Sequence, residues 1–307
     1  MLLFLDGAAG TTGLRIHERL SGRTDLKLLA LSDAERKDPL KRREALNSCD
    51  IAMLCLPDEA AREAVSMIEN PAVRVIDAST AHRTATGWAY GFPELKGQFR
   101  KKIETGNRVA VTGCHASGFL ALVQPLVYAG LLPADALLTC HSVTGYSGGG
   151  KKMIARYEED ARCSLLDAPR QYGLSQNHKH LPEMKSVAGL QTEPIFCPIV
   201  SDFYSGMCVT VPMFKSQLKG TAEDVKRIYA ETYTGPVVRY TETADEGGFL
   251  SANAMAGKDA MQISVYGNGE RVLLTALFDN LGKGASGAAV QCLNLMTGQD
   301  ETTGLVL

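Results

Sequence analysis

The residue with the clearest chemical potential is a cysteine between a strand-like run and a helix-like run. The run 108–111 is of β type, Gly113 follows it closely, and Cys114 comes just before an apolar stretch, 116–129, that predicts a helix. The first turn of a helix has unpaired N–H groups and a positive dipole end, and both stabilise a thiolate. Since the thiolate is the nucleophilic form, this position predicts that Cys114 is a catalytic nucleophile.

The other seven cysteines fit a different interpretation, that of small buried hydrophobic residues. Cys163 has no evident partner, and the remaining six lie among apolar residues: Cys49, Cys55, Cys140, Cys197, Cys208 and Cys292. No paired CxxC spacing points to a zinc ribbon or a disulfide framework, so we expect a reducing, cytoplasmic location.

A glycine-rich turn near the start of the chain has the context of a dinucleotide-binding loop. It follows a buried strand predicted over 2–5 and precedes a helix predicted from Leu14 to about Leu20. The spacing is GxxGxxG rather than GxGxxG, and a purely structural tight turn is the alternative. Close backbone approach to a pyrophosphate at a helix N-terminus needs this strand, turn and helix. The cofactor-binding residues expected here are Gly7, Gly10, Thr11, Thr12 and Gly13.

The first part of the chain alternates strands and helices. Strands predicted over 27–31, 50–56 and 73–77 are almost continuously apolar, which is typical of a parallel sheet covered on both faces. Ligands of such sheets bind beyond the carboxyl ends of the strands. This edge therefore adds three expected cofactor-binding residues to the glycine turn: Ser32, Pro57 and Ser79.

The residues after the second strand bear on the choice of cofactor. Ser32 offers a hydroxyl, and Arg36 and Lys37 are suited to a ribose 2′-phosphate. The alternative is NAD, because the Asp33 carboxylate could hydrogen-bond a free ribose 2′-hydroxyl. We predict NADP.

The second part of the chain is rich in strands. They are predicted over 137–143, 194–200, 206–211, 237–241, 261–267 and 271–277, with a hairpin at Asn268-Gly269. A final helix over 286–296, with small residues on it, is expected to pack back onto the first domain. We predict an α/β Rossmann-type NADP-binding domain, 1–113 completed by 285–307. The rest, 114–284, is predicted to be an α+β catalytic and dimerisation domain with a largely antiparallel or mixed sheet.

Composition excludes several classes of function. The 307 residues suffice for two domains, and 45% hydrophobic and 21% charged residues are typical of a globular protein. A net charge of −2 gives no reason to expect nucleic acid or a membrane surface as partner. The apolar run 1–5 is too short for a signal peptide, and no stretch approaches membrane-spanning length.

Eight motifs, in order, give the chain a resemblance to a known family. They are Gly7–Gly13 (GAAGTTG), Val75–Arg83 (VIDASTAHR), Tyr90–Leu95 (YGFPEL), Gly113–Ser117 (GCHAS), Gly145–Lys151 (GYSGGGK), His178–Glu183 (HKHLPE), Val211–Met213 (VPM) and Asp279–Ala285 (DNLGKGA). From about Leu3 to Gly298 the chain resembles the shorter form of N-acetyl-γ-glutamyl-phosphate reductase. Longer members usually carry Cys-Tyr-Pro-Thr where this chain has CHAS. The resemblance implies NADP-dependent, reversible conversion of N-acetyl-glutamyl 5-phosphate into N-acetyl-glutamate 5-semialdehyde and phosphate, in arginine biosynthesis.

The residues support that chemistry. Cys114 would attack the acyl phosphate, forming a thioester that accepts a hydride, and a histidine would move the protons near neutral pH. In a strand-like segment His178 and His180 would share one face. We favour His180 as acid/base and keep His178 as the alternative, one of the two being a supporting or surface residue. Glu183 could orient the imidazole that acts.

The substrate phosphate needs cationic or N–H donors. The candidates are Arg83, Ser147, Gly148 and Lys151, of which the last three lie in a glycine-rich loop that could also be a surface hairpin. Pairing of Arg83 with Glu94 is the alternative for that arginine. By the resemblance, Asn280 contacts the nicotinamide end, and Ser117 and Pro57 line the site.

Two other functions compete with this interpretation. Aspartate-semialdehyde dehydrogenase shares the fold and the thioester, but its cysteine usually follows asparagine, whereas Gly113 precedes Cys114 here. A zinc-binding regulator would use Cys114, His178 and His180, a spacing unlike common structural zinc sites. We therefore predict no metal, a small acyl phosphate or semialdehyde as substrate, and a homo-oligomer, either a dimer or a tetramer.

Overall fold

The computed structural model describes residues 1–32 and 34–307, so Asp33, which kept NAD open as an alternative, lies outside the described residues. The chain forms two compact units, and each is described by itself. The first consists of Met1–Pro93, Phe99–Thr112 and Ala285–Leu305. The second consists of Glu94–Gln98, Gly113–Gly284 and Val306–Leu307. These units differ from the predicted domains at 94–98, at residue 113 and at the last two residues.

The first unit contains a six-stranded sheet in which every pairing is parallel. Its order is β2 (Lys27–Leu29), β1 (Leu2–Asp6), β3 (Ile51–Leu54), β4 (Arg74–Asp77), β6 (Arg108–Val111) and β5 (Ala89–Gly91). The predicted parallel sheet is confirmed. Strand β5 was not expected, because three residues are too few to produce a recognisable apolar pattern.

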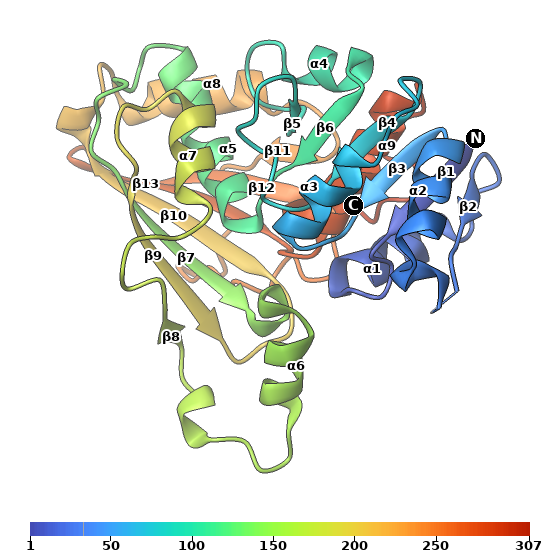
Figure 1. Ribbon diagram of the computed structural model, residues 1–307. Coiled ribbons are helices and arrows are strands. Elements are labelled where there is room, and N and C mark those ends of the chain that lie inside the picture. Colours follow the sequence, from blue (N-terminus) through green and yellow to red (C-terminus); the bar gives the residue numbers. More distant parts are fainter. Residues whose placement is uncertain (33) are drawn as a thin grey trace. The chain divides into compact units, whose positions relative to one another are not determined.

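Helices cover both faces of this sheet (Figure 1). One face packs against α1 (Thr11–Leu20), α4 (Phe99–Thr105) and α9 (Gly287–Met296), and the other against α2 (Pro39–Ser48) and α3 (Asp58–Ser66). Successive strand residues point to opposite faces, so Leu3 and Leu5 join the first core and Phe4 the second. This double burial explains the continuously apolar strands.

The second unit contains a seven-stranded mixed sheet. Its order is β11 (Val238–Tyr240), β12 (Met261–Gly267), β13 (Arg271–Phe278), β10 (Met207–Phe214), β7 (Thr139–Gly145), β9 (Ile195–Ser201) and β8 (Arg170–Gln171). The pairs β11·β12 and β7·β9 are parallel, and the others are antiparallel. The predicted mixed sheet and the hairpin at Asn268-Gly269 are both confirmed.

Helices α5 (Cys114–Tyr128) and α8 (Ala222–Thr232) pack on one face of this sheet, and α7 (Leu181–Ala188) packs against α5 (Figure 1). Helix α5 approaches β10 so closely that a Cβ at Gly118 would lie 2.5 Å from Cγ2 of Val209. Although α5 is almost entirely buried and apolar, no helix in the described part of the chain has the length and hydropathy to cross a membrane.

Shorter elements complete the chain. Helix α6 (Gly150–Glu158) follows the glycine-rich loop of the second unit. Single helical turns lie at Glu35–Lys37, Tyr146–Gly149, Ser164–Leu166, Lys215–Gln217 and, as a π-turn, Gly282–Ser286.

The opposite face of the mixed sheet carries large apolar side chains that are exposed. Ile195 on β9 is 61% exposed, Phe214 on β10 is 63% exposed, and Leu273 on β13 is 40% exposed. On β10, Pro212 and Phe214 alternate with the buried residues, and Pro212 is paired with Leu273 of β13, so Phe214 and Leu273 lie on one face. The pairing of β7 with β10 and with β9 puts Ile195 on the same face. We call this the open sheet face.

Candidate functional site

Cys114 is the first residue of α5. The helix begins two residues before the predicted start, at the extended N-cap residue Gly113, and no side chain of the described residues caps it. A Cβ at Gly284 would lie 3.0 Å from Cβ of Cys114, so this glycine is needed for the close packing around the cysteine. The thiol therefore stands on the positive end of a fifteen-residue helix.

The other cysteines lie in different surroundings. Burial raises the pKa of Cys49 to about 11 and that of Cys55 to about 12, and it also raises the pKa of Cys140 and Cys208. These thiols stay protonated and inert. Cys163 is exposed, and no disulfide joins the described cysteines.

Glu183 connects the start of α5 to the histidine pair. Its Oε2 accepts a hydrogen bond from the Gly113 N–H at 3.3 Å, and its Oε1 lies 3.9 Å from Nε2 of His180. Both side chains are buried, Glu183 on the first turn of α7 and His180 at its N-cap. The carboxylate is therefore placed to contact the His180 ring and to fix the backbone next to Cys114.

The strand predicted for the histidine pair is wrong. His178 and His180 lie in a turn that leads into α7, and the backbone N–H of His180 donates to Nδ1 of His178 at 3.2 Å. Their rings still meet edge to face, with centroids 4.8 Å apart. A helix N-terminus preceded by a tight turn brings the two rings together as effectively as strand alternation would.

Sequence reasoning missed a third histidine, the residue after the cysteine. His115 is buried, its Nδ1 lies 2.7 Å from Oγ of Ser142, and its Nε2 lies 2.7 Å from the hydroxyl of Tyr172. Burial, followed by the nearby His178, lowers the pKa of His115 to about 3. The inward position of Ser142, between Cys140 and Thr144 on β7, was the available sequence signal.

The glycine-rich loop after β7 is a packed turn leading into α6, so the surface-hairpin alternative is wrong. Asn280 holds it: Nδ2 donates to Oγ of Ser147 at 3.0 Å, while Oδ1 accepts from the Gly206 N–H at 2.9 Å. Gly148 lies beside the same amide, and Lys151 is exposed on α6. Ser117 is buried, and its hydroxyl donates to the carbonyl of Gly113 at 3.1 Å.

Within the described residues, no cluster of three or more His, Cys, Asp or Glu side chains could hold a metal ion.

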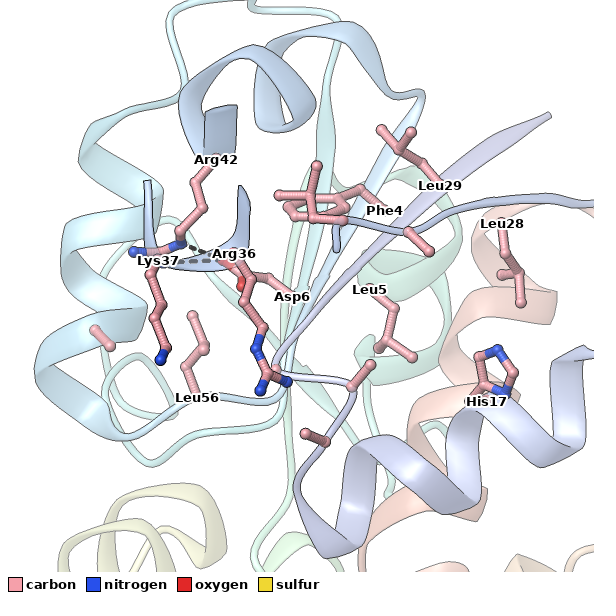
Figure 2. A pocket seen from close by; sticks show the side chains of 16 residues that line it. Phe4, Leu5, Asp6, His17, Leu28, Leu29, Arg36, Lys37, Arg42 and Leu56 are labelled. Carbon is pink, nitrogen blue, oxygen red and sulfur yellow. Dashed lines mark hydrogen bonds and ion pairs between the residues drawn. The ribbon is translucent and has the colours of Figure 1, made fainter. Parts of the chain in front are cut away.

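The first unit contains a pocket of about 330 Å³ at the glycine turn (Figure 2). Its lining includes the turn itself, His17 on α1, and the side chains of Arg36 and Lys37. Sequence reasoning missed a further pair there: Nη2 of Arg42 lies 2.9 Å from Oδ2 of Asp6. The cations therefore line the pocket beside the start of α1.

The turn has the geometry that a phosphate-binding loop needs. Gly7 has φ of +87°, and a Cβ there would lie 2.3 Å from the carbonyl oxygen of Cys55. A Cβ at Gly13 would lie 2.5 Å from the carbonyl oxygen of Gly7. Gly10 is the N-cap of α1, no side chain of the described residues caps this helix, and Thr11 and Thr12 begin it. The residues present thus fit a dinucleotide pyrophosphate.

The remaining predicted residues of the first unit have structural partners. Ser32 donates its hydroxyl to Glu35 at 2.7 Å, and Ser79 donates its own to Asp77 at 2.7 Å. Pro57 is the N-cap residue of α3. Nε of Arg83 donates to the carbonyl of Val111 at 2.9 Å.

Two family models match the chain. Residues 5–104 match the NAD-binding domain of semialdehyde dehydrogenases, and residues 114–280 match their dimerisation domain. The first unit is accordingly a nicotinamide-dinucleotide-binding domain of Rossmann type. A solved structure of aspartate semialdehyde dehydrogenase II from Vibrio cholerae, complexed with ASA, has the same fold. Its TM-score is 0.71 at 17% identity, over 97% of this chain and 98% of that one.

Sequence comparison gives closer matches. N-acetyl-γ-glutamyl-phosphate reductase 2 of Pseudomonas putida is 49% identical over 97% of this chain and 97% of its own length. The reductase of Burkholderia ambifaria is 48% identical over 97% of this chain and 96% of its own length. The chain therefore belongs to the N-acetyl-γ-glutamyl-phosphate reductase family, within the semialdehyde dehydrogenases.

Proposed function

We propose that this chain catalyses the reversible, NADP-dependent conversion of N-acetyl-γ-glutamyl phosphate into N-acetylglutamate semialdehyde and phosphate. The observation that carries the proposal is the start of α5, where Cys114 stands beside a buried Glu183 and a histidine pair. The names of relatives at 48% and 49% identity support the choice of substrate.

Cys114 acts as the nucleophile. Its thiolate, stabilised by the α5 dipole, attacks the acyl carbon; the new C–S bond replaces the C–O bond to phosphate, which leaves with the bonding electron pair. NADPH, when bound, supplies a hydride to the thioester carbonyl carbon. Breaking the C–S bond then returns the thiolate and releases the semialdehyde.

His180 moves the proton. It accepts the thiol proton when the thiolate forms and gives a proton to the carbonyl oxygen when negative charge develops there. When the C–S bond breaks, His180 takes this proton back from the oxygen, and the aldehyde carbonyl forms. Glu183, 3.9 Å from its Nε2, stabilises the protonated ring. Burial and the charge of Lys179 lower the pKa of His178, so that ring stays neutral at pH 7. Because Nδ1 of His178 accepts from a backbone N–H, its Nε2–H is the donor that orients the substrate.

The substrate phosphate is bound by the glycine-rich loop after β7 and by nearby basic side chains. Ser147 and Gly148 offer short donors in a loop that Asn280 holds in place. Lys151 begins the helix after this loop and adds positive charge. Arg83 remains a candidate for bidentate recognition, with Ser117 lining the site at α5. Asn280 contacts the nicotinamide end of the cofactor in this proposal.

NADP is preferred over NAD. Arg36 and Lys37 line the pocket at the glycine turn, and both are basic side chains suited to a 2′-phosphate (Figure 2). Gly7, Gly10, Thr11, Thr12 and Gly13 hold the pyrophosphate, while Ser32, Pro57 and Ser79 lie at the carboxyl ends of neighbouring strands and border the nucleotide.

The chain forms a homo-oligomer, a dimer or a tetramer, through the open sheet face. The family model over 114–280 describes a dimerisation domain, and large apolar side chains are exposed on this face. Phe214→Glu should convert the oligomer into monomers in sedimentation velocity, whereas Leu40→Glu, at an exposed leucine of α2, should not. An unchanged mass for Phe214→Glu would contradict the proposed interface.

Steady-state kinetics in the reverse direction test the activity. N-acetylglutamate semialdehyde with phosphate should reduce NADP, and aspartate semialdehyde should react at least about 100-fold less well in kcat/KM, a difference of the size set by unmatched polar groups. The opposite preference would reassign the chain to the aspartate branch. Stoichiometric zinc in the purified protein would instead favour the metal-binding regulator.

A further inference from the structure

Three side chains of the second unit form a continuous hydrogen-bonded chain behind the nucleophile. Ser142 comes from β7, His115 from the first turn of α5, and Tyr172 from the segment just after β8. Oγ of Ser142 lies 2.7 Å from Nδ1 of His115, and Nε2 of His115 lies 2.7 Å from the hydroxyl of Tyr172. Both nitrogens of one imidazole are therefore occupied by hydroxyl groups.

Counting donors fixes the direction of this chain. Ser142 is fully buried, and among the described residues His115 is the only hydrogen-bond partner of its hydroxyl group. If Nδ1–H donated to Ser142, the serine O–H would be a buried donor without an acceptor, which costs free energy. Ser142 must therefore donate to Nδ1. A neutral His115 then carries its proton on Nε2 and donates to the oxygen of Tyr172.

His115 remains neutral across the working pH range. It is 3% exposed and packs against the rings of His178, His180 and Phe196, with centroids 5.7, 5.6 and 5.2 Å away. Burial, and after it the proximity of His178, lower the pKa of His115 to about 3. The neighbouring Glu183 faces His180 and the Gly113 N–H.

In this arrangement the phenol hydrogen of Tyr172 is available for donation to a ligand. The oxygen of Tyr172 accepts from His115, and no described residue accepts its hydrogen. The side chain is half-buried and stands beside the rings of His115 and His178. Burial, and after it the charge of Cys114, raise the pKa of Tyr172, so the phenol is protonated at neutral pH. Its partner His115 directly follows Cys114 on the first turn of α5.

We propose that His115 is a positioning residue whose Nε2–H tautomer, imposed by Ser142, turns the hydroxyl of Tyr172 into a hydrogen-bond donor for the substrate oxygen at Cys114. The chain transfers no proton; it only fixes which way the phenol points. Tyr172 would supplement His180 by stabilising negative charge on the carbonyl oxygen. The identity of that oxygen rests on the proposed function.

A double-mutant cycle tests the dependence of Tyr172 on Ser142. Tyr172→Phe should lower kcat about 100-fold, as removal of an oxyanion donor does, and Ser142→Ala should lower it about 5-fold by releasing the tautomer. The double variant should be no slower than Tyr172→Phe alone. Tyr128→Phe, at an exposed tyrosine of α5, serves as control and should leave kcat unchanged. Independent, multiplying losses would overturn the proposal.

The tautomer itself can be measured without catalysis. In protein labelled with ¹⁵N-histidine, with only six histidines to assign, Nε2 of His115 should carry the proton and Nδ1 should not, unchanged from pH 6 to 9. Ser142→Ala should mix the two tautomers. A protonated Nδ1 in the unmodified protein would refute the proposal, whatever the variants do. If N-acetylglutamate semialdehyde is not a substrate, the proposed function fails while this measurement still decides the tautomer.

Discussion

Helices α1 and α5 both begin at a glycine shortly after a parallel strand. Gly10 has φ of −74° and ψ of 163°, Gly113 has φ of −80° and ψ of 147°, and no side chain of the described residues caps either helix. Both starts therefore direct a positive helix end at whatever lies in front of it. The two helix starts differ in the group that lies in front of them. The pocket at the start of α1 is lined by Arg36 and Lys37, whereas the first residue of α5 is itself a cysteine.

The difference shows how one backbone device serves two purposes. In the first unit the anion comes with the ligand, so the turn needs glycines and space. In the second unit the anion that we propose, the Cys114 thiolate, is part of the chain; the start of the helix is buried and the N–H of Gly113 is held by Glu183. A helix start that binds a ligand must be accessible, whereas one that carries a nucleophile must be held in place and partly shielded from water.

Removal of the Cys114 sulfur should have the largest effect on activity. Cys114→Ser should reduce turnover by about 10⁴-fold or more, because a serine hydroxyl at this position has no comparable acidity. Binding of NADP, measured by fluorescence titration, should change by less than about 2-fold. Cys163→Ser, at an exposed cysteine, is the matched control. Turnover close to that of the unmodified enzyme would exclude a covalent thioester.

The turn before α1 can be tested in the same way. Gly7→Ala forces a Cβ to within 2.3 Å of a backbone oxygen at φ of +87°. We expect a loss of about 3 kcal/mol in the free energy of unfolding, together with loss of NADP binding. At Gly22 no described atom lies within 4 Å of the added Cβ, so Gly22→Ala should be close to neutral in urea denaturation. Equal effects would show that the turn is not constrained.

The basic side chains beside the glycine turn should affect the choice between NADP and NAD. Replacing Arg36 and Lys37 by Ala should weaken NADP binding by on the order of 1–3 kcal/mol and leave NAD binding nearly unchanged. Lys41→Ala with Arg43→Ala is the control, because these exposed cations of α2 pair with Glu44 and Glu69 instead. Isothermal titration with both nucleotides gives the answer. An equal loss for NAD would assign the two residues another role.

The burial of His115 at the start of α5 should make a small contribution to the pH dependence of stability. The folded pKa of His115 is about 3, below the unfolded value near 6.5, so the unfolded chain binds a proton that the folded chain does not. Stability attributable to this histidine is therefore full above pH 6.5 and falls as the pH drops toward 3. Between pH 7.5 and 5.5 the loss should be about 1.4 kcal/mol in urea denaturation, and His115→Gln should lack it. An identical loss in the variant would contradict the burial argument.

Some features followed from short stretches of sequence. The continuously apolar strands predicted the parallel sheet of the first unit, Asn268-Gly269 predicted the hairpin in the mixed sheet of the second, and the position of Cys114 predicted a thiol at a helix start. The turn that holds His178 and His180 was predicted as a strand, because a two-residue alternation contains too little information to distinguish the two. The role of Asn280 in holding Ser147 was also missed, since the two are far apart in the sequence.

The features that can be read from the amino-acid sequence are therefore local: burial pattern, helix starts and turns, each of which depends on neighbouring residues. The partners of buried polar groups became known from the folded structure. Lys283, which is fully buried, lies 2.7 Å from Glu94, and His115 meets Ser142 only because the register of β7 turns that hydroxyl inward. The physical reason is that a buried charge or hydroxyl must find a partner wherever packing places one, and packing joins residues without regard to their distance along the chain.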